Sequence, residues 1–489
     1  MNRAALITSL GALGAGSLAA CSGVSQILPG GDDEHSRQDT GKTVTTDIVV
    51  VGSGLSGIGA ARTVLSYGRS VVVLEARDRV GGRVFSDNTT FRGFPFDFGA
   101  QFFQQVISGN ILFQIAKARG IDVVDISSLP SRFYVGSKPA STDQFAAFLQ
   151  TFSDMLQDIL AAGATIEKPR QDFAASKVTD LYARSPWQRN AIAVHVSGTS
   201  LAEPDASSLL DVATFLQVSP VPFSTPGDFY VTESGMGNFV ASLANGLPVT
   251  KSSPVVSIAR DNAGVTVKTR TASYRAKAVI VTVPTAVLAA GGIEFTPNLP
   301  TNVRDAIADL PIGVLYKFAI GFKPGFLNGF TTTTPITALS NEPLTPTYFV
   351  KINNQNVIEG LIDVGESLEA MPRSRQISTI LGKIENTLPG AKNAFDGRFA
   401  STSWSKQQYS LGSYSRAKIG GVGARTLLRA PVGRVYFAGE AVGFGGLHSS
   451  MHGAYTSGIA QAAAALKAMG VNVRRSRTSA SREQSTLGL

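Results

Sequence analysis

The pattern of hydrophobic and polar positions becomes regular after Thr45. Residues 45–51 form a hydrophobic run typical of a buried strand. Residues 52–68 have helical spacing and end on Gly68, a favourable residue for closing a helix. A second β-branched run follows at residues 70–76. The order strand, helix, strand predicts a βαβ unit, and its continuation predicts an α/β fold with a largely parallel sheet.

The middle of the chain has a different pattern. Between Val106 and Phe229 helical spacing dominates, as in residues 145–163, and glycine motifs are rare. Strand-like runs return at residues 253–270, 278–283, 314–322 and 434–440. We therefore expect a discontinuous nucleotide-binding domain with a substrate domain inserted in pieces. The expected boundaries are 45–105, 232–295 and 405–470 for the first domain, and 106–231 and 296–404 for the second.

Three glycines lie at the predicted turn between the first strand and its helix, with the spacing Gly52-x-Gly54-x-x-Gly57. The first allows a tight turn, the second lets backbone N–H groups approach a pyrophosphate, and the third lets the helix pack on the strand. Glu75 follows at the end of the second strand, where a carboxylate accepts hydrogen bonds from ribose hydroxyls. An acid at this position favours NAD or FAD over NADP. The segment therefore predicts a dinucleotide site.

Composition narrows the class of protein. The chain has 489 residues, of which 43% are hydrophobic and 50 are glycine. These values fit a globular protein of about two or three folding units. The formal net charge is +9, but the basic residues form no long run apart from Val473–Arg482. We interpret residues 471–489 as a disordered basic tail and expect no nucleic-acid partner. No metal site is expected, because no His, Cys and Asp cluster has the spacing of metal ligands.

The single cysteine, Cys21, follows an uncharged run rich in Ala, Gly and Leu. That run predicts a secretory signal at residues 1–20, because it is too short for a comfortable membrane span. Leu18–Cys21 resembles the bacterial lipoprotein box, which implies an acylated Cys21, a lipidated tether over 21–44 and anchoring to a membrane of the bacterial cell envelope. The alternative is an ordinary cleaved signal with an incidental cysteine. One cysteine also excludes a redox-active cysteine pair within the chain.

The segment after Glu75, with Arg77, Gly81, Gly82 and Arg83, resembles the signature of the flavin amine oxidase family, which includes monoamine and polyamine oxidases and flavin histone demethylases. The resemblance extends over nearly the whole chain after Thr45. It implies FAD as the cofactor, in a Rossmann-like FAD-binding domain of the glutathione-reductase-like type with an inserted α+β substrate domain. An arginine at position 83 can offset pyrophosphate charge.

Further segments resemble the cofactor-binding segments of that family. They are residues 96–103, the strand around Val255, the segment 435–440, and the helix that begins near Met451. The resemblance implies FAD contacts at sixteen positions: Gly52, Gly54, Ser56, Gly57, Glu75, Arg77, Gly82, Arg83, Gly99, Ala100, Gln101, Phe102, Val255, Gly439, Glu440 and Met451.

Three residues match catalytic positions of the family. Lys317 matches the lysine that holds a water near flavin N5, whereas its alternative is a strand lysine that faces solvent. Tyr414 matches one wall of an aromatic cage for the amine, and Ser450 stands at the second wall. Ser413 occupies the position where some members attach FAD through a cysteine, so the FAD is expected to be non-covalent. Gln104 matches a position that is often an acid or His in polyamine oxidases, and it cannot anchor an ammonium by charge.

The resemblance implies an FAD-dependent oxidase that removes a hydride from the carbon next to the nitrogen of a small-molecule amine. The imine is then hydrolysed, and oxygen or another electron acceptor reoxidises the flavin, with hydrogen peroxide formed when the acceptor is oxygen. Two alternatives stay open from the sequence. One is a carotenoid-type desaturase or isomerase that acts on C–C bonds. The other is a non-catalytic envelope lipoprotein that binds FAD.

Overall fold

The computed structural model describes residues 43–218, 227–339 and 345–473. The predicted signal, Cys21 and nearly all of the predicted tether lie outside these ranges, as does the basic tail from residue 474. In the described ranges, no helix combines the length and the apolar character needed to cross a membrane.

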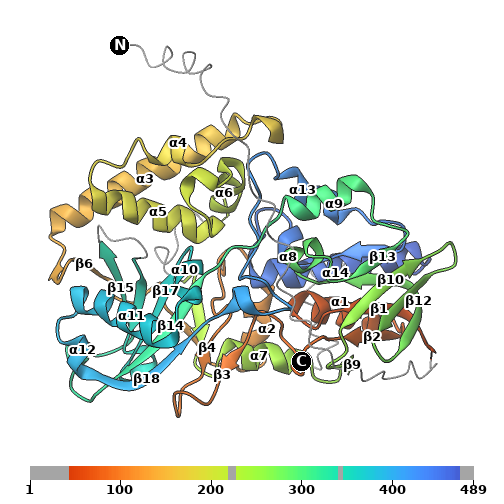
Figure 1. Cartoon of the computed structure of the whole chain (residues 1–489), viewed down its shortest axis with the longest axis horizontal. Coiled ribbons are helices and arrows are strands. Elements are labelled where there is room, and N and C mark those ends of the chain that lie inside the picture. The colour runs from red at the N-terminus through yellow and green to blue at the C-terminus, as the bar shows by residue number, and fades with distance from the viewer. Residues whose placement is uncertain (1–42, 219–226, 340–344, 474–489) are drawn as a thin grey trace. The chain divides into compact units, whose positions relative to one another are not determined.

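The first sheet has eight strands and holds the predicted βαβ unit (Figure 1). Most neighbouring strands are parallel, and the antiparallel pairs are those that β11 makes with β10 and β12. In spatial order the strands are β13 (Glu294–Thr296), β10 (Val255–Arg260), β11 (Val265–Thr269), β12 (Ser273–Val281), β1 (Thr43–Val51), β2 (Val71–Leu74) and β9 (Val249–Thr250), with β19 (Val435–Phe437) also paired to β12.

The strand β1 is central because its sequence suits burial on both faces. Ile48, Val49 and Val50 have no exposed surface, as expected for a parallel strand covered on both sides. Val49 and Val50 lie opposite Val72 and Val73 of β2, in parallel register. This confirms the predicted strand and its parallel pairing with the second strand of the βαβ unit.

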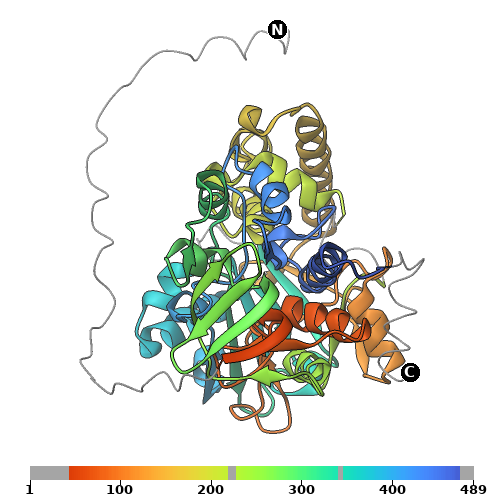
Figure 2. The same cartoon turned by 90° about the vertical axis from the view of Figure 1, so that its right-hand side faces the viewer.

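Two helices cover one face of this sheet. They are α1 (Leu55–Ser66), which ends two residues before the predicted Gly68, and α14 (Met451–Ala468). Figure 2 shows α1 in red-orange beside α14 in dark blue. They approach so closely at Gly458 that a Cβ atom there would lie 1.9 Å from the backbone oxygen of Ser56. The close packing places the N-termini of both helices at the edge of the same cavity.

The second sheet has seven strands and lies on the other side of the cavity (Figure 1). Its strand β14 (Tyr316–Phe322), which lies between β18 and β17, is buried along its whole length. In spatial order the strands are β18 (Phe395–Ser401), β14, β17 (Val357–Ile362), β16 (Thr347–Val350), β15 (Thr334–Leu339), β6 (Arg132–Val135) and β7 (Lys138–Pro139). Two short pairs complete the strands: β3 (Ser86–Asp87) with β4 (Phe96–Asp97), and β5 (Val123–Asp125) with β8 (Tyr230–Thr232).

Helices dominate the region after β7, as the sequence predicts. The long helix α3 (Thr142–Ala164) contains the predicted helical stretch and begins with a capping box, in which Ser141 and Gln144 satisfy each other's backbone N–H groups. It is followed by α4 (Ser176–Thr179), α5 (Pro186–Ser200) and α6 (Leu209–Leu216). The remaining helices are α2 (Ile111–Ala118), α7 (Met236–Leu243), α8 (Thr285–Ala289), α9 (Thr301–Ala308), α10 (Glu366–Ala370), α11 (Arg373–Thr387), α12 (Ala391–Ala394) and α13 (Gly423–Arg429).

Two segment boundaries differ from those expected. The strand β1 begins at Thr43, two residues inside the predicted tether, because Thr43 and Val44 extend the parallel pairing with β12. At the other end, Val471 and Val473 pack against the core although they fall in the predicted tail. Both differences arise from tertiary packing, which the local composition does not report. The division of the two domains along the chain stays a prediction.

Candidate active site

A cavity of about 770 Å³ is lined by residues from both sheets and from the helical region. All three residues predicted to be catalytic line it. Of the sixteen positions predicted to bind FAD, every one lines it except Gly57. The structure thus brings together residues separated by up to four hundred positions of sequence, and their individual roles stay predictions.

The glycine loop after β1 forms one end of this cavity. Gly52 has a φ of +104°, a backbone conformation that a side chain would strain. Gly57 lies behind the loop and packs on the strand, because a Cβ there would lie 1.9 Å from the Gly52 oxygen. Its absence from the lining agrees with the packing role expected for the third glycine. The first turn of α1 carries no acid, so its N–H groups and the helix dipole present positive potential to the cavity.

Glu75 lies directly after β2, as expected, and is buried. One oxygen of its carboxylate accepts hydrogen bonds of 2.7 Å from both the backbone N–H and the hydroxyl of Ser53. The other accepts from the backbone N–H of Arg77 at 2.9 Å. These contacts fix the carboxylate against the glycine loop at the cavity wall, where it can still accept from a ribose hydroxyl.

Arg83 and Glu440 form an ion pair at the cavity wall, with 2.9 Å between Nη1 and Oε1. The Arg83 guanidinium also donates to the Ser413 carbonyl at 2.9 Å, and Ser415 donates to Glu440 through its hydroxyl at 2.7 Å. Burial acts to raise the pKa of Glu440, but Arg83 and the Ser415 hydroxyl hold that pKa below its ordinary value. Part of the Arg83 charge that was expected to face a pyrophosphate is therefore neutralised by Glu440.

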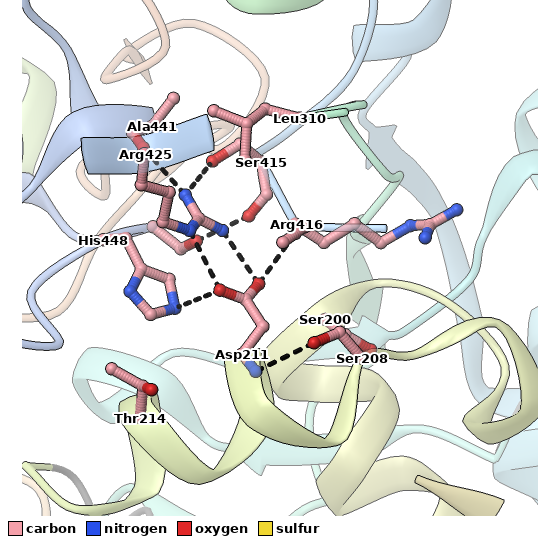
Figure 3. A network of polar contacts seen from close by, with 12 residues as sticks. Ser200, Ser208, Asp211, Thr214, Leu310, Ser415, Arg416, Arg425, Ala441 and His448 are labelled. Carbon is pink, nitrogen blue, oxygen red and sulfur yellow. Dashed lines mark hydrogen bonds and ion pairs between the residues drawn. The ribbon is translucent and has the colours of Figure 1, made fainter. Parts of the chain in front are cut away.

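A buried polar network continues from Ser415 to α6 (Figure 3). Arg425 donates to the Ser415 hydroxyl at 3.0 Å and forms two hydrogen bonds of 2.9 Å with the Asp211 carboxylate. His448 Nε2 lies 3.5 Å from the same carboxylate. Burial acts to raise the pKa of Asp211, but Arg425 and His448 hold it well below its ordinary value. Burial and Arg425 together lower the pKa of His448 to about 4, so that the ring is neutral at pH 7. The network ties the helical region to the segment that carries Tyr414.

Lys317 is buried, with 2% of its surface exposed, which excludes the solvent-facing alternative. Its ammonium donates to the carbonyl oxygens of Asp97 at 2.5 Å and of Gly99 at 3.0 Å, and to the side-chain oxygen of Gln101. It also lies 3.3 Å from Oε1 of Glu359 on β17. Burial raises the pKa of Glu359, and the positive charge of Lys317 opposes that rise. Lys317 thus fixes the segment expected to run beneath the flavin.

Tyr414 and Ser450 both line the cavity, but their hydroxyls differ in what they can do. The Tyr414 hydroxyl donates to the carbonyl oxygen of Gly198 on α5, and burial raises its pKa well above the ordinary value. Its ring is therefore held as a neutral wall. The Ser450 hydroxyl accepts from the Gly453 N–H at 3.1 Å and donates to the Leu447 carbonyl at 2.7 Å, as the N-cap of α14. These contacts favour a structural role for it, and its part in catalysis stays a prediction.

Two further polar residues line the cavity. Gln104 has a buried Oε1 atom with no hydrogen-bond partner in the described part of the chain. Asp363 was missed by the sequence analysis, because it follows a hydrophobic strand and belongs to no motif. Burial raises the pKa of Asp363 to about 7. A carboxylic acid that follows a buried strand was the one available signal, and only the fold shows that it borders the cavity.

The cavity suits FAD on the evidence of its own walls. Gly52 and Gly54 leave the backbone bare beside the N-terminus of α1, where a pyrophosphate could approach. Gly439 has a φ of +151°, and a Cβ there would enter open space, so the backbone forms the wall itself. Glu75, which is predicted to bind the ribose, lies at the cavity wall, and the N-terminus of α14 borders the same cavity. No other residue type would leave this room at the glycine positions.

Comparison with known proteins identifies the family. The family model described as flavin containing amine oxidoreductase matches residues 55–466. The chain belongs to this family. FAD is therefore the cofactor of this flavin-containing amine oxidoreductase, as predicted, and the chain is an FAD-dependent oxidoreductase.

Individual relatives agree with that membership. The oxidoreductase is 29% identical over 439 residues to polyamine oxidase 4 of Oryza sativa subsp. japonica, with 85% of this chain and 87% of that protein covered. It is 28% identical over 454 residues to lysine-specific histone demethylase 1 homolog 1 of Arabidopsis thaliana, with 86% of this chain but only 52% of that protein covered.

Solved structures show the same fold. Putrescine oxidase bound to putrescine aligns with a TM-score of 0.75 at 19% identity, over 87% of this chain and 100% of that chain. Cyclohexylamine oxidase from Brevibacterium oxydans IH-35A aligns with a TM-score of 0.74 at 22% identity, over 87% of this chain and 99% of that chain. The predicted fold class, a Rossmann-like FAD-binding domain with an α+β substrate domain, is confirmed.

Proposed function

We propose that this oxidoreductase oxidises a C–N bond of a small-molecule amine and uses oxygen as the electron acceptor. The observation that carries the proposal is that two sets of residues, one predicted to bind the cofactor and one predicted to act on the amine, line a single cavity. The glycine loop and Glu75 lie at one end, and Lys317 and Tyr414 line the same space. Relatives named for polyamines, putrescine and cyclohexylamine support an amine as the substrate.

Bound FAD would supply the two-electron chemistry, in which a hydride would leave the carbon next to the nitrogen and the electron pair would end on oxygen as hydrogen peroxide. The protein binds and orients the amine. The Tyr414 ring is held by its hydrogen bond to Gly198, so that its face can guide a neutral amine nitrogen. The imine product then reacts with water to give a carbonyl compound and ammonia or a smaller amine.

In this proposal Lys317 is a positioning residue for the segment 97–101. Its ammonium binds two backbone oxygens and the Gln101 side chain, so the segment 97–101 is held in one geometry. For Lys317 to hold a water near the cofactor, one of these contacts must give way to the water. The proposal needs no further strong base, because the amine that reacts arrives neutral.

Peroxide release over a panel of amines tests the proposal. The purified protein, reconstituted with FAD, is mixed with primary, secondary and cyclic amines, and peroxide is measured with a coupled peroxidase. Peroxide that depends on the amine supports the proposal. A protein that holds FAD but gives no flavin reduction with any amine would contradict it, and would favour C–C bond oxidation or a non-catalytic role.

We further propose that the enzyme is exported and anchored by lipid on Cys21. The support is sequence alone, since the Leu18–Cys21 motif lies outside the described residues. Two or more acyl chains hold a protein firmly, at about 0.8 kcal/mol for each buried CH₂. Cys21→Ser should abolish metabolic palmitate labelling and move the protein from the membrane to the soluble fraction. Wild-type protein that takes up no label would favour the ordinary cleaved signal.

A further inference from the structure

One carboxylate in the cavity has no partner. Asp363 lines the cavity, and within the described ranges its side chain forms no hydrogen bond and no ion pair. Asp363 is half-buried, whereas the buried acids of the described residues each have at least one polar partner. They are Glu75, Asp97, Asp211, Glu359, Glu369 and Glu440.

Strand geometry explains why Asp363 points at the cavity. Alternate residues of β17 share one face, so Glu359, Leu361 and Asp363 follow one another along it. Glu359 lies beside the Lys317 ammonium, and Leu361 pairs in register with Lys317 and lines the cavity. Asp363 is the next position on this face, just past the end of β17. It therefore lies along the cavity wall from Lys317, on the side away from Glu359.

The helix α5 makes room for the carboxylate. A Cβ atom at Gly198 would lie 3.2 Å from Asp363 Oδ2, so glycine leaves the space that the carboxylate uses. The carbonyl oxygen of Gly198 accepts the hydrogen bond of Tyr414. Asp363 therefore lies near the hydroxyl end of the Tyr414 ring, and its charge contributes to the raised pKa of Tyr414.

An unpaired carboxylate in such a place is costly to the folded protein. Burial raises the pKa of Asp363 to about 7, which shows how strongly the site disfavours its negative charge. Groups of this kind are rare in structural roles and common in binding sites, where a ligand provides the missing partner. A cationic ligand would provide that partner here.

We propose that Asp363 binds a second, non-reacting ammonium group of the substrate, so that the enzyme prefers diamines or polyamines to monoamines. The reacting nitrogen must be neutral to lose a hydride from its carbon, whereas a buried carboxylate holds an ammonium in its charged form. The two demands are met on one substrate only if they fall on different nitrogens. This inference rests on the proposed amine oxidation and adds the substrate class to it.

The test compares two amines that differ only in the second nitrogen, cadaverine and pentylamine. The ratio of their kcat/KM values is measured for the FAD-loaded wild type and for Asp363→Asn, which keeps the shape but removes the charge. Wild type should prefer cadaverine. Asp363→Asn should lower the ratio of cadaverine to pentylamine roughly 10- to 100-fold, which is the usual contribution of a hydrogen bond to a charged group. The loss should appear mainly in the KM for cadaverine.

Three variants make the result decisive. Asp363→Glu keeps the charge and should retain more of the preference than Asp363→Asn. Asp305→Asn removes an equal charge from an exposed position of α9 and should leave the ratio unchanged. An unchanged ratio in Asp363→Asn overturns the inference but leaves amine oxidation standing, and so does a wild type with no preference. A wild type that oxidises neither amine, nor any other amine of the panel, overturns both.

Discussion

Arg83 and Glu440 stand 357 residues apart in the sequence and meet in an ion pair of 2.9 Å at the wall of the cofactor cavity. Arg83 comes from the Gly-Gly-Arg segment after β2, and Glu440 follows β19. The pair therefore joins two segments that are predicted to bind FAD, and it links them to the Ser415 and Arg425 network.

Glu440→Gln should weaken FAD retention and lower stability together. The variant leaves the partly buried Arg83 without its counter-charge. Removing one partner of a buried ion pair lowers the free energy of unfolding by roughly 3–5 kcal/mol. Because 20% of the Arg83 side chain is exposed, we expect the lower part of that range. The measurements are the FAD dissociation constant from flavin fluorescence and the free energy of unfolding from urea titration.

A double-mutant cycle with Arg83→Gln separates the pair from its surroundings. The double variant should recover part of the stability that each single variant loses, because no charge is then left unpaired. Strictly additive losses would show that the two side chains do not interact in the folded protein.

FAD should be released intact when the protein is denatured by heat. The chain has a single cysteine at position 21, and Ser413 stands where some family members attach the cofactor. The Ser413 hydroxyl accepts from the Leu315 N–H at 3.0 Å and donates to the Leu315 carbonyl, so it is engaged in the backbone. The yellow colour should move to the supernatant with the spectrum of free FAD. Colour that stays with the precipitate would contradict non-covalent binding.

Lys317→Met should slow flavin reduction or reoxidation by roughly 10²- to 10⁴-fold, the usual contribution of a positioned group. It should also destabilise the protein by roughly 3–5 kcal/mol, because Glu359 is left buried without its cation. The second variant, Lys317→Met with Glu359→Gln, should recover most of the stability. Stopped-flow absorbance and urea titration measure the two effects separately.

The double variant is the informative one. If stability returns and the flavin kinetics stay slow, Lys317 acts on the reaction itself. If both return together, Lys317 serves only to neutralise Glu359, and the role implied by family resemblance does not apply to this chain.

The sequence predicted those parts of the site that depend on short-range pattern. The glycine loop, Glu75 and the helix α1 follow from local spacing, and the structure places them as expected. The buried strand around Lys317 was also visible, but its burial on both faces was not.

Asp211, Arg425 and Asp363 could not be predicted. Asp211 and Arg425 are 214 residues apart, and only the packing of α6 against the segment 415–425 brings them together. The position of the Asp363 side chain depends on the space left by Gly198, which lies on the helix α5. Such sites are defined by long-range contacts between elements whose own patterns report only their burial.

His452→Gln should make the protein less sensitive to acid. The ring of His452 is buried on α14, and its Nε2 lies 2.8 Å from the side-chain oxygen of Gln105. Burial lowers the pKa of His452 from 6.5 to about 4. Between these two pH values the unfolded chain binds a proton that the folded protein does not, so stability must fall as the pH falls through this window.

The difference between the two pKa values corresponds to a loss of about 3 kcal/mol in the free energy of unfolding, caused by this one ring. Glutamine keeps a donor for Gln105 and cannot titrate, so the variant should lose less stability than wild type between pH 6.5 and about 4. Buried carboxylates with raised pKa values, such as Asp363, act with the opposite sign but are common to both proteins and cancel in the comparison. Urea titration at several pH values measures the difference. Parallel curves would show that His452 is protonated in the folded protein, and the neutral, hydrogen-bonded ring described here would then be wrong.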